Sequence, residues 1–293
     1  MNFVIIDLEW NGAFSKRVHG YFNEIIEIGA IKLDENLREM DRFQAIIHPV
    51  ISKKLTSLVT SLTSITDEDL TDGGTFTGAM SALRKWIGKT ETVVLTWSTT
   101  DLLVLLENYR YFCKTETIPF LTAYLDLQAY YQQRQNLPLF QQVALSKACE
   151  QLGINEEDVA HHRALDDSIL TGRILTRIYD KPSFSRAVSP ANAEFYRRIT
   201  FKNTYITNAD HPLVKPEYLV FTCPFCHAPL RVDGHWHGHN RALCASAVCD
   251  VCDKTFTARV QIKQKFDAVE VKRKLVEKQK ITPAGEEKEN VYG

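Results

Sequence analysis

Residues 3–9 read Phe-Val-Ile-Ile-Asp-Leu-Glu, an apolar run rich in β-branched residues that ends in two acids. Such a run favours a buried strand. Because side chains alternate along a strand, Asp7 and Glu9 share one face of it. Two carboxylates at the end of a buried face are costly unless a cation compensates their charge. The stretch therefore predicts a first strand with a metal-binding end, although a D-x-E pattern by itself also arises by chance.

Two more strand-like runs, 24–33 and 42–48, follow with short links, which indicates an antiparallel meander. A short buried strand is expected at 93–97. Helical patterns are expected over 75–88, 100–112, 126–133, 141–152 and 164–179. Three strands followed by alternating helix and strand predict an α/β fold for residues 1–180, with a mixed sheet flanked by helices.

Further acids and a histidine stand near predicted helix starts. Asp101 follows the strand 93–97 in the first turn of a helix, where an acid also serves as an ordinary capping residue. In the last helix, Asp167 shares a face with apolar residues, whereas Asp166 shares its face with two arginines, so Asp167 is expected to point inward. His162 precedes that helix by two residues, and a lone histidine is more often a surface residue than a functional one.

The order of these features carries more information than any one of them. A strand-end D-x-E, an acid after a later strand and an H-x-x-x-x-D at a helix start together resemble the DEDDh exonuclease family, whose fold is ribonuclease-H-like. Residues 1–180 carry the resemblance. The family's motif residues are matched by Asp7, Glu9, Asp101, His162 and Asp167.

Smaller features refine the resemblance. The run 24–30, Glu-Ile-Ile-Glu-Ile-Gly-Ala, is similar to the family's second strand, and Thr96-Trp97 is most similar to the branch that trims histone mRNA and small RNAs. Two departures concern substrate placement. Trp10-Asn11 stands where many members have threonine, and Ser98 stands where glycine or asparagine is usual.

The resemblance implies a metal-dependent 3′→5′ exonuclease that releases nucleoside 5′-monophosphates from single-stranded nucleic acid, with RNA favoured over DNA. Mg²⁺ or Mn²⁺ prefers carboxylate oxygens, and two such ions about 3.5–4 Å apart activate water and stabilise the leaving oxygen. We expect Asp7 to bridge both ions. Glu9 and Asp167 then bind the ion that activates water, with Asp101 contacting it through water. His162 serves as the general base.

Two alternatives stay open on the sequence. One is a proofreading-type exonuclease of a DNA polymerase. The other, from a different functional class, is a non-catalytic nucleic-acid-binding adaptor with an exonuclease-like domain. The presence of all five motif residues favours an enzyme over the adaptor.

The second chemical feature is a pair of CxxC motifs in the C-terminal part of the chain. Cys223-Pro-Phe-Cys226 and Cys249-Asp-Val-Cys252 resemble the two knuckles of a zinc ribbon, and four thiolates hold Zn²⁺ in a closed, structural site. Cys244 is a spare thiol that could replace Cys249. We expect a linker at 181–216, a β-rich zinc-ribbon-like module at 217–270 and a charged, flexible tail at 271–293.

Charge is distributed unevenly between these parts. Residues 1–180 carry 17 Lys+Arg and 24 Asp+Glu, a net charge of −7, whereas residues 181–293 carry 18 and 12, a net charge of +6. The basic half, with Phe225, Trp236 and Phe256 for base stacking, favours a single-strand nucleic-acid grip over a protein-binding scaffold.

The chain contains no apolar run near the ~20 residues that a membrane span needs, and its N-terminus lacks the basic region of a signal peptide. The sequence therefore predicts no membrane partner and a cytoplasmic location.

Overall fold

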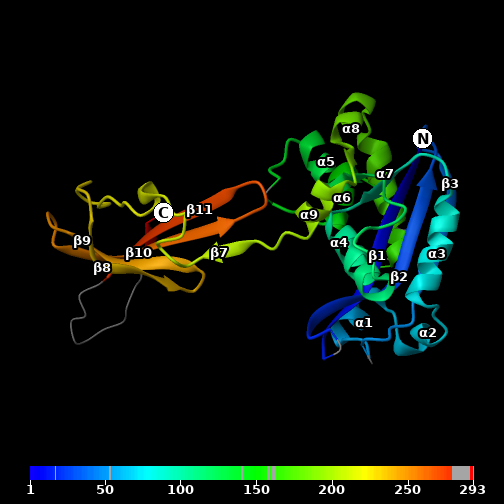
Figure 1. Cartoon of the computed structure of the whole chain (residues 1–293). Helices are drawn as coiled ribbons and strands as arrows, with labels where there is room; N and C mark the ends of the chain where they lie inside the picture. Colours follow the sequence, from blue (N-terminus) through cyan, green and yellow to red (C-terminus); the bar gives the residue numbers. More distant parts are fainter. Residues whose placement is uncertain are drawn as a thin grey trace. The chain divides into compact units, whose positions relative to one another are not determined.

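The computed structural model describes residues 1–16, 18–52, 54–139, 141–156, 159, 163–278 and 291–292 (Figure 1). The chain divides into two compact units, Met1–Thr200 and Phe201–Gly293. Each unit has its own sheet and its own buried core.

The first unit is built on a six-stranded sheet of order β3-β2-β1-β4-β5-β6. Its strands are β1 (Asn2–Ser15), β2 (Gly20–Leu33), β3 (Glu39–Ile46), β4 (Thr92–Thr96), β5 (Ala123–Asp126) and β6 (Ser189–Pro190). β1, β4 and β5 are parallel, whereas β2, β3 and β6 run antiparallel to their neighbours. The predicted mixed sheet is therefore confirmed, with β5 and β6 as strands that the sequence pattern had not indicated.

Helices cover both faces of this sheet, and β1 divides its side chains between them. Val4, Ile6 and Leu8 pack against α3 (Phe76–Ile87), α4 (Thr100–Asn108) and α9 (Ala193–Ile199). Phe3 and Ile5 face α5 (Leu127–Arg134), α6 (Leu145–Leu152), α7 (Ala164–Ile178) and α8 (Lys181–Ala187). This alternation follows from the two-residue period of a strand, and it places the middle of β1 between two helical layers.

Short helices complete the unit. A π-helical turn (Tyr109–Cys113) continues α4, and α1 (Ser57–Thr63) and α2 (Asp67–Thr71) lie in the polar segment after β3. No helix in the described part of the chain combines the length and the apolar character that crossing a bilayer requires.

The predicted linker at 181–216 is wrong in its first part, because α8 and α9 belong to the first unit. Phe184 is 1% exposed and Phe195 is 3% exposed, so both helices are anchored in its core. Pro182 lies in the first turn of α8, a position that tolerates proline because its N–H has no helical partner there. The prolines of this segment therefore stand at the ends of helices and strands. The first unit extends to Thr200.

The second unit is a β-sheet of order β12-β11-β10-β9-β8, with β7 paired to β10. Its elements are β7 (Thr204–Ile206), a 3₁₀ turn (Pro216–Tyr218), β8 (Arg231–His239), β9 (Ala242–Cys249), β10 (Lys254–Gln264), β11 (Val269–Glu277) and β12 (Val291–Tyr292). Phe256, Ala258, Val260 and Ile262 of β10 are fully buried and form the inward face of the strand. The expected role of Phe256 in base stacking is therefore wrong, because its ring lies in the core of this unit.

The predicted flexible tail at 271–293 is wrong in its first part, since 271–277 belong to β11. The run Lys272-Arg273-Lys274 suggested a solvated charged segment, but Leu275 beside it is 5% exposed and packs in the core of the second unit. The rest of the predicted tail consists of Lys278, β12 and residues 279–290 and 293. Residues 279–290 and 293 lie outside the described residues.

Candidate active site

Asp7 and Glu9 lie in the middle of β1, where the edge of the strand that faces β4 is no longer paired. β4 pairs with β1 only as far as Ile5, opposite Leu95. Beyond this point the chain after β4 turns into α4, whose first turn contains Asp101. Asp101 is 7% exposed, which is unusual for a carboxylate that serves only as a surface cap. The divergence of β4 from β1 therefore creates the space in which the three acids meet.

The fourth acid, Asp167, lies in the first turn of α7, which packs closely on β1 and β2. The close approach requires glycine. A Cβ placed on Gly29 would lie 2.0 Å from the backbone nitrogen of Leu165, and one on Gly172 would lie 2.5 Å from the side chain of Ile31. The hydroxyl of Ser168 also donates to the carbonyl of Gly29 at 3.0 Å. These contacts fix the N-terminal turn of α7, and hence Asp167, against the sheet.

Three of the acids converge closely. Asp7, Glu9 and Asp167 each offer a carboxylate oxygen, and these oxygens lie within 4.8 Å of one another. Asp101 lines the same cavity, which has a volume of about 550 Å³. Trp10, Trp97, Ser98, Gln128, Gln142 and Glu156 are among its other lining residues. The helical phase that selected Asp167 over Asp166 thus agrees with the structure, because Asp166 does not line this cavity.

The buried carboxyl groups of the cavity favour a bound cation. Burial raises the pKa of Glu9 to about 8, and repulsion from Asp167, Glu27 and Asp101 adds to the shift. Burial also raises the pKa of Asp7 well above its usual value and that of Asp101 to about 7. Ionised carboxylates this close together are unfavourable without a compensating positive charge. Oxygen donors at this spacing fit hard divalent ions such as Mg²⁺ or Mn²⁺.

An ion pair between Arg163 and the buried Glu27 anchors the same turn of α7. Glu27 on β2 is fully buried, and its carboxylate accepts from the guanidinium of Arg163 at 2.7 to 3.2 Å. It also accepts from the backbone N–H of Ala164 at 3.2 Å and from the amide of Gln44 at 2.7 Å. Because four donors satisfy it, this carboxylate holds Arg163, the residue that directly follows His162 in the chain, in a fixed position.

The predicted general base itself, His162, lies outside the described residues. The role of Glu27 had not been predicted. An acid inside the apolar run 24–33 is the signal that could have revealed it, because a buried carboxylate needs a partner. The same reasoning applies to Glu24, which is 1% exposed and accepts from the backbone N–H groups of Val50, Ile51 and Ser52.

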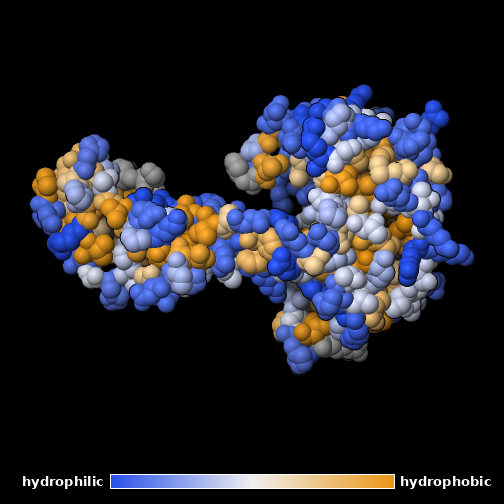
Figure 2. Space-filling view, turned by 45° about the horizontal axis from the view of Figure 1, so that its top comes forward, coloured by the Kyte–Doolittle hydropathy of each residue, from blue (hydrophilic) through white to orange (hydrophobic). Residues whose placement is uncertain are grey.

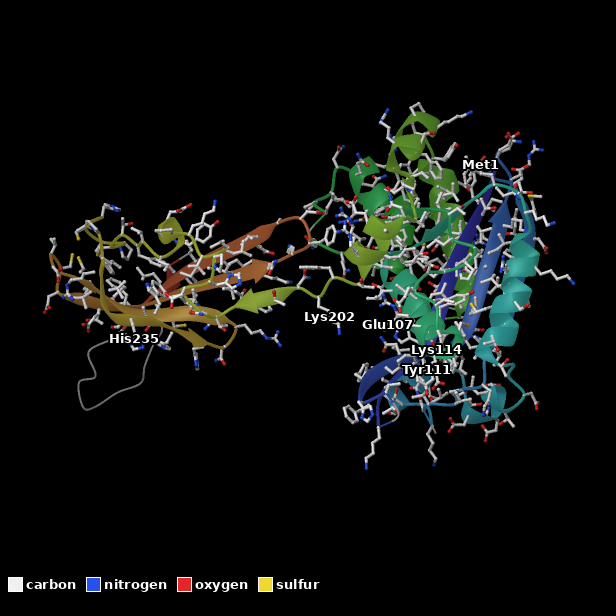
Figure 3. All side chains as sticks on the ribbon, viewed as in Figure 1. Met1, Glu107, Tyr111, Lys114, Lys202 and His235 are labelled. Carbon is white, nitrogen blue, oxygen red and sulfur yellow. The ribbon has the colours of Figure 1, made fainter. Side chains whose placement is uncertain are left out.

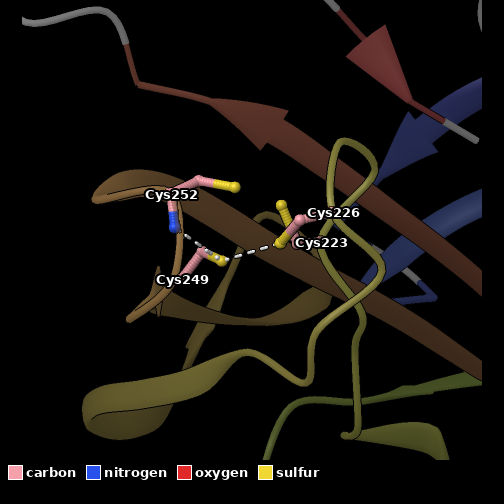
Figure 4. A group of neighbouring side chains, drawn as sticks. All are labelled: Cys223, Cys226, Cys249 and Cys252. Carbon is pink, nitrogen blue, oxygen red and sulfur yellow. Dashed lines mark hydrogen bonds between the residues drawn. The ribbon is translucent and has the colours of Figure 1, made fainter.

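The four predicted cysteine ligands also come together, in the second unit (Figure 4). The sulfur atoms of Cys223, Cys226, Cys249 and Cys252 lie within 4.8 Å of one another. The Sγ atoms of Cys226 and Cys249 are 3.4 Å apart, and the backbone N–H of Cys252 donates to the Sγ of Cys249 at 3.4 Å. Cys244 is not a member of the group; its Sγ lies 3.8 Å from the guanidinium of Arg259.

Two features of this cluster suit a metal. The backbone N–H of Cys252 is the main reason that the pKa of Cys249 falls to about 7, whereas the hydrogen bond with Cys226 raises the pKa of Cys252 to about 12, so the thiolate is favoured at Cys249. Both knuckles also turn through left-handed backbone, at His227 (φ 59°) and Asp253 (φ 51°), as tight sulfur-presenting turns require. Four sulfurs without an open position fit a closed tetrahedral Zn²⁺ site.

The mixed sheet with its acidic cavity defines a nuclease of the ribonuclease-H-like class. Residues 4–175 match the model of the exonuclease family known as RNase T, and the chain belongs to this family. That match covers the whole of the acidic cavity and stops before the second unit.

Individual proteins agree with this assignment. A PolC-type DNA polymerase III from Mycoplasma pneumoniae is 29% identical over 178 residues, which cover 61% of this chain and 11% of the polymerase. Human ERI1 exoribonuclease 2 is 29% identical over 196 residues, which cover 56% of this chain and 26% of that protein. The chain thus matches only a small part of either relative.

Among solved structures, the nuclease domain of 3′hExo, a DEDDh family member solved with bound rAMP, is 26% identical with a TM-score of 0.53. The match covers 60% of this chain and 90% of that domain. The predicted ribonuclease-H-like exonuclease domain is therefore confirmed.

Proposed function

We propose that this chain is a metal-dependent 3′→5′ exonuclease that acts on single-stranded nucleic acid and releases nucleoside 5′-monophosphates. The observation that carries the proposal is the convergence of Asp7, Glu9 and Asp167 within 4.8 Å, with Asp101 lining the same cavity. Divalent ions bound by these acids supply positive charge to the scissile phosphate and lower the pKa of water.

The acids then have distinct tasks. Asp7 lies among the other carboxylates, since Asp101, Asp167 and Glu9 all repel its charge, and this central place suits a bridging ligand. Glu9 and Asp167 would hold the ion that activates the attacking water. Asp101 does not belong to the group of three within 4.8 Å and would contact that ion through water.

His162 accepts the proton of the attacking water. Arg163, the next residue in the chain, is held by its ion pair with Glu27. We expect His162→Ala to lower turnover by about 10²–10⁴-fold, the usual contribution of a general base, while Mn²⁺ affinity measured by calorimetry stays unchanged. His161→Ala is the matched control and should retain turnover. Equal turnover in wild type and His162→Ala removes the histidine from the mechanism.

RNA is favoured over DNA as the substrate. The support is the similarity to human ERI1 exoribonuclease 2, while the similarity to a PolC-type DNA polymerase III supports the proofreading alternative at the same level of identity. Labelled single strands of RNA and DNA, each with a free or a blocked 3′ end, distinguish these substrates. Release of mononucleotides from free 3′ ends that requires a divalent ion supports an enzyme, and its absence with both strands supports the non-catalytic adaptor.

The second unit, with structural Zn²⁺ on its four cysteines, grips the strand through a basic sheet face. Lys272 and Lys274 lie two residues apart on β11, so both point to one face, and both are exposed. Arg259 of β10 lies on this face as well, because it pairs with Lys274. Lys263 shares the face with Arg259, since the residues between them that point the other way, Val260 and Ile262, are buried in the core.

Removing two of these charges has a predictable effect on binding. Single-strand affinity falls with salt with a log–log slope of about −0.7 per neutralised phosphate. Lys272→Ala combined with Lys274→Ala should therefore flatten the slope by about 1.4, measured by fluorescence anisotropy on a long strand in Ca²⁺. Lys85→Ala with Lys89→Ala removes the same charge from the first unit as a control. An unchanged slope in the first variant argues for the scaffold alternative.

A further inference from the structure

The strands β1 and β2 continue beyond the sheet as a two-stranded ribbon. β4 leaves β1 after Ile5, and β3 pairs with β2 only as far as Glu27. From Trp10 onward, β1 pairs only with β2, up to Ser15 opposite Gly20. Because an isolated hairpin is only marginally stable, a ribbon of this length needs contacts with other parts of the unit to keep it folded.

Contacts with other parts of the first unit hold the base and the middle of the ribbon. Asn11 is fully buried, donates to the carbonyl of Lys54 at 3.0 Å and accepts from the N–H of Thr56 at 3.0 Å. Phe22 packs on Tyr111, with ring centroids 5.4 Å apart, and Lys114 lies 5.2 Å from the Tyr111 ring (Figure 3). Phe22 is thus a support of the ribbon.

The opposite face of the ribbon carries aromatic rings that remain in solvent. Phe14 pairs with Tyr21, and Gly12 pairs with Asn23, so Trp10, Phe14 and Tyr21 share one face. Phe14 is 74% exposed and Tyr21 is 70% exposed. Orange side chains are visible on the lower projection of the first unit in Figure 2, where Figure 1 draws this ribbon and α1.

Gly12 determines the direction of the Tyr21 ring. A Cβ at residue 12 would lie 2.2 Å from the hydroxyl oxygen of Tyr21, so the ring lies over the glycine and extends from the tip of the ribbon toward Trp10. Trp10 in turn lines the acidic cavity beside Glu9. Trp10, Tyr21 and Phe14 therefore follow one another along one face of the ribbon, from a residue that lines the cavity to the tip.

The dimensions of this row suit a single strand. Trp10 and Phe14 are four residues apart, or about 13 Å at 3.3 Å per residue. Stacked bases are about 3.4 Å apart, so the row has space for about four nucleotides. Lys16 and His19 at the turn of the ribbon are exposed and supply donors for phosphates at its far end.

We propose that Tyr21 and Phe14 form a stacking track for the bases that lie just upstream of the 3′-terminal nucleotide, with Trp10 at the entrance to the cavity. This track rests on the proposed exonuclease function and explains how the chain holds a strand without reading its sequence, since every base has a π-face. Continuity with the acidic cavity favours nucleic acid over a protein partner as the occupant.

The test is a length series of 5′-labelled single strands from two to ten nucleotides, hydrolysed by wild type and by Phe14→Ala/Tyr21→Ala. We expect the wild-type KM to fall with length up to about five nucleotides. The double variant should raise KM at least about tenfold on the longer strands, as expected for the loss of stacking, with the same kcat and with an unchanged KM on the dinucleotide. Phe14→Tyr/Tyr21→Phe keeps both rings and should behave as wild type.

A second arm identifies which bases the rings contact. Abasic sites at the third and fourth positions from the 3′ end should raise the wild-type KM by a similar factor and have no further effect in the double variant. Met40→Ala, which removes an exposed apolar side chain from the edge strand β3, is the control for surface truncation. Thermal unfolding of each variant separates a loss of folding from a loss of contact.

The outcomes separate the two proposals. If wild type hydrolyses none of the strands, the exonuclease proposal fails. If it hydrolyses them but the double variant has the wild-type KM at every length, only the stacking track is overturned. A change in self-association of that variant by sedimentation, without a change in KM, identifies a protein-docking surface instead and also overturns the track.

Discussion

Replacing Asp7 by asparagine should abolish hydrolysis and at the same time make the metal-free protein more stable at neutral pH. Hydrolysis should be lost because the carboxylate that repels all the other acids of the cavity no longer contributes a charge to the cations. Metal ions contribute several kcal/mol of transition-state stabilisation, so we expect kcat to fall by at least about 10³-fold.

The gain in stability follows from the direction of the pKa shifts. The folded pKa of Asp7 lies well above its unfolded value, mainly because of burial, so its ionised form destabilises the metal-free fold. The penalty is absent below the unfolded pKa, where the group is protonated in both states, and it grows as the pH rises toward the folded pKa. Glu9, at about 8, and Asp101, at about 7, extend this window to neutral pH.

Thermal unfolding in EDTA from pH 4 to pH 8 measures this effect. The melting temperature of the wild type should fall as the pH rises through this range, and that of Asp7→Asn should fall less. With excess Mg²⁺ the order reverses, because only the wild type gains the stabilisation of bound ligand.

Asp166→Asn is the matched control for this experiment. It makes the same chemical change one residue from Asp167, in a side chain that does not line the cavity. It should retain hydrolysis. Full activity of Asp7→Asn, or a melting temperature in EDTA that is lower than that of wild type at pH 8, would contradict the acidic cluster as the catalytic site.

Local patterns in the sequence indicated the direction of three of the acids of this cavity, and the resemblance to a known family singled out the whole set. The alternation along the first strand placed Asp7 and Glu9 on one face, and helical phase selected Asp167 over Asp166. Both inferences concern the direction of side chains within one strand or one helix, and this direction follows from the spacing of residues in the sequence. The distance from Asp101 to the other acids depends on where β4 leaves β1, and only the fold determines that.

Other features depended on partners that are far apart in the chain. Glu27 and Arg163 are separated by 136 residues, so the pattern around either one does not reveal the ion pair. The ribbon was underestimated for another reason. Gly12 and Asn23 interrupt the apolar alternation beyond Trp10, so the strand appeared to end at residue 9, whereas backbone pairing continues to Ser15.

Amino-acid composition alone did not predict the domain boundaries correctly. Prolines and charged residues led to a linker at 181–216 and a tail from 271, but α8, α9 and β11 occupy much of both segments. In each case a few buried side chains, such as Phe184 and Leu275, outweigh the polar residues around them. Burial of those side chains depends on surfaces that other parts of the chain supply.

Replacing Cys226 by serine should unfold the second unit and leave the first unit folded. Zinc bound by four thiolates contributes an apparent free energy of about 10–16 kcal/mol to the folding of small domains, which exceeds the usual stability of a whole domain. The unit has a limited core around Phe256 and Val260, so we expect the protein to lose nearly all of its zinc and much of its strand signal in circular dichroism. Limited proteolysis should then leave a fragment that ends near Thr200.

The same variant separates the two metal sites, because all four acids of the cavity belong to the first unit. Hydrolysis of a dinucleotide should persist after zinc is lost, while affinity for long strands should fall. Cys244→Ser is the control that decides between the two ligand sets considered for the sequence, and it should retain one zinc per chain because its sulfur lies outside the cluster. Loss of zinc from Cys244→Ser, or full zinc in Cys226→Ser, would exclude the four-cysteine set. Dinucleotide hydrolysis that disappears together with the zinc would show instead that the first unit depends on the second for its fold.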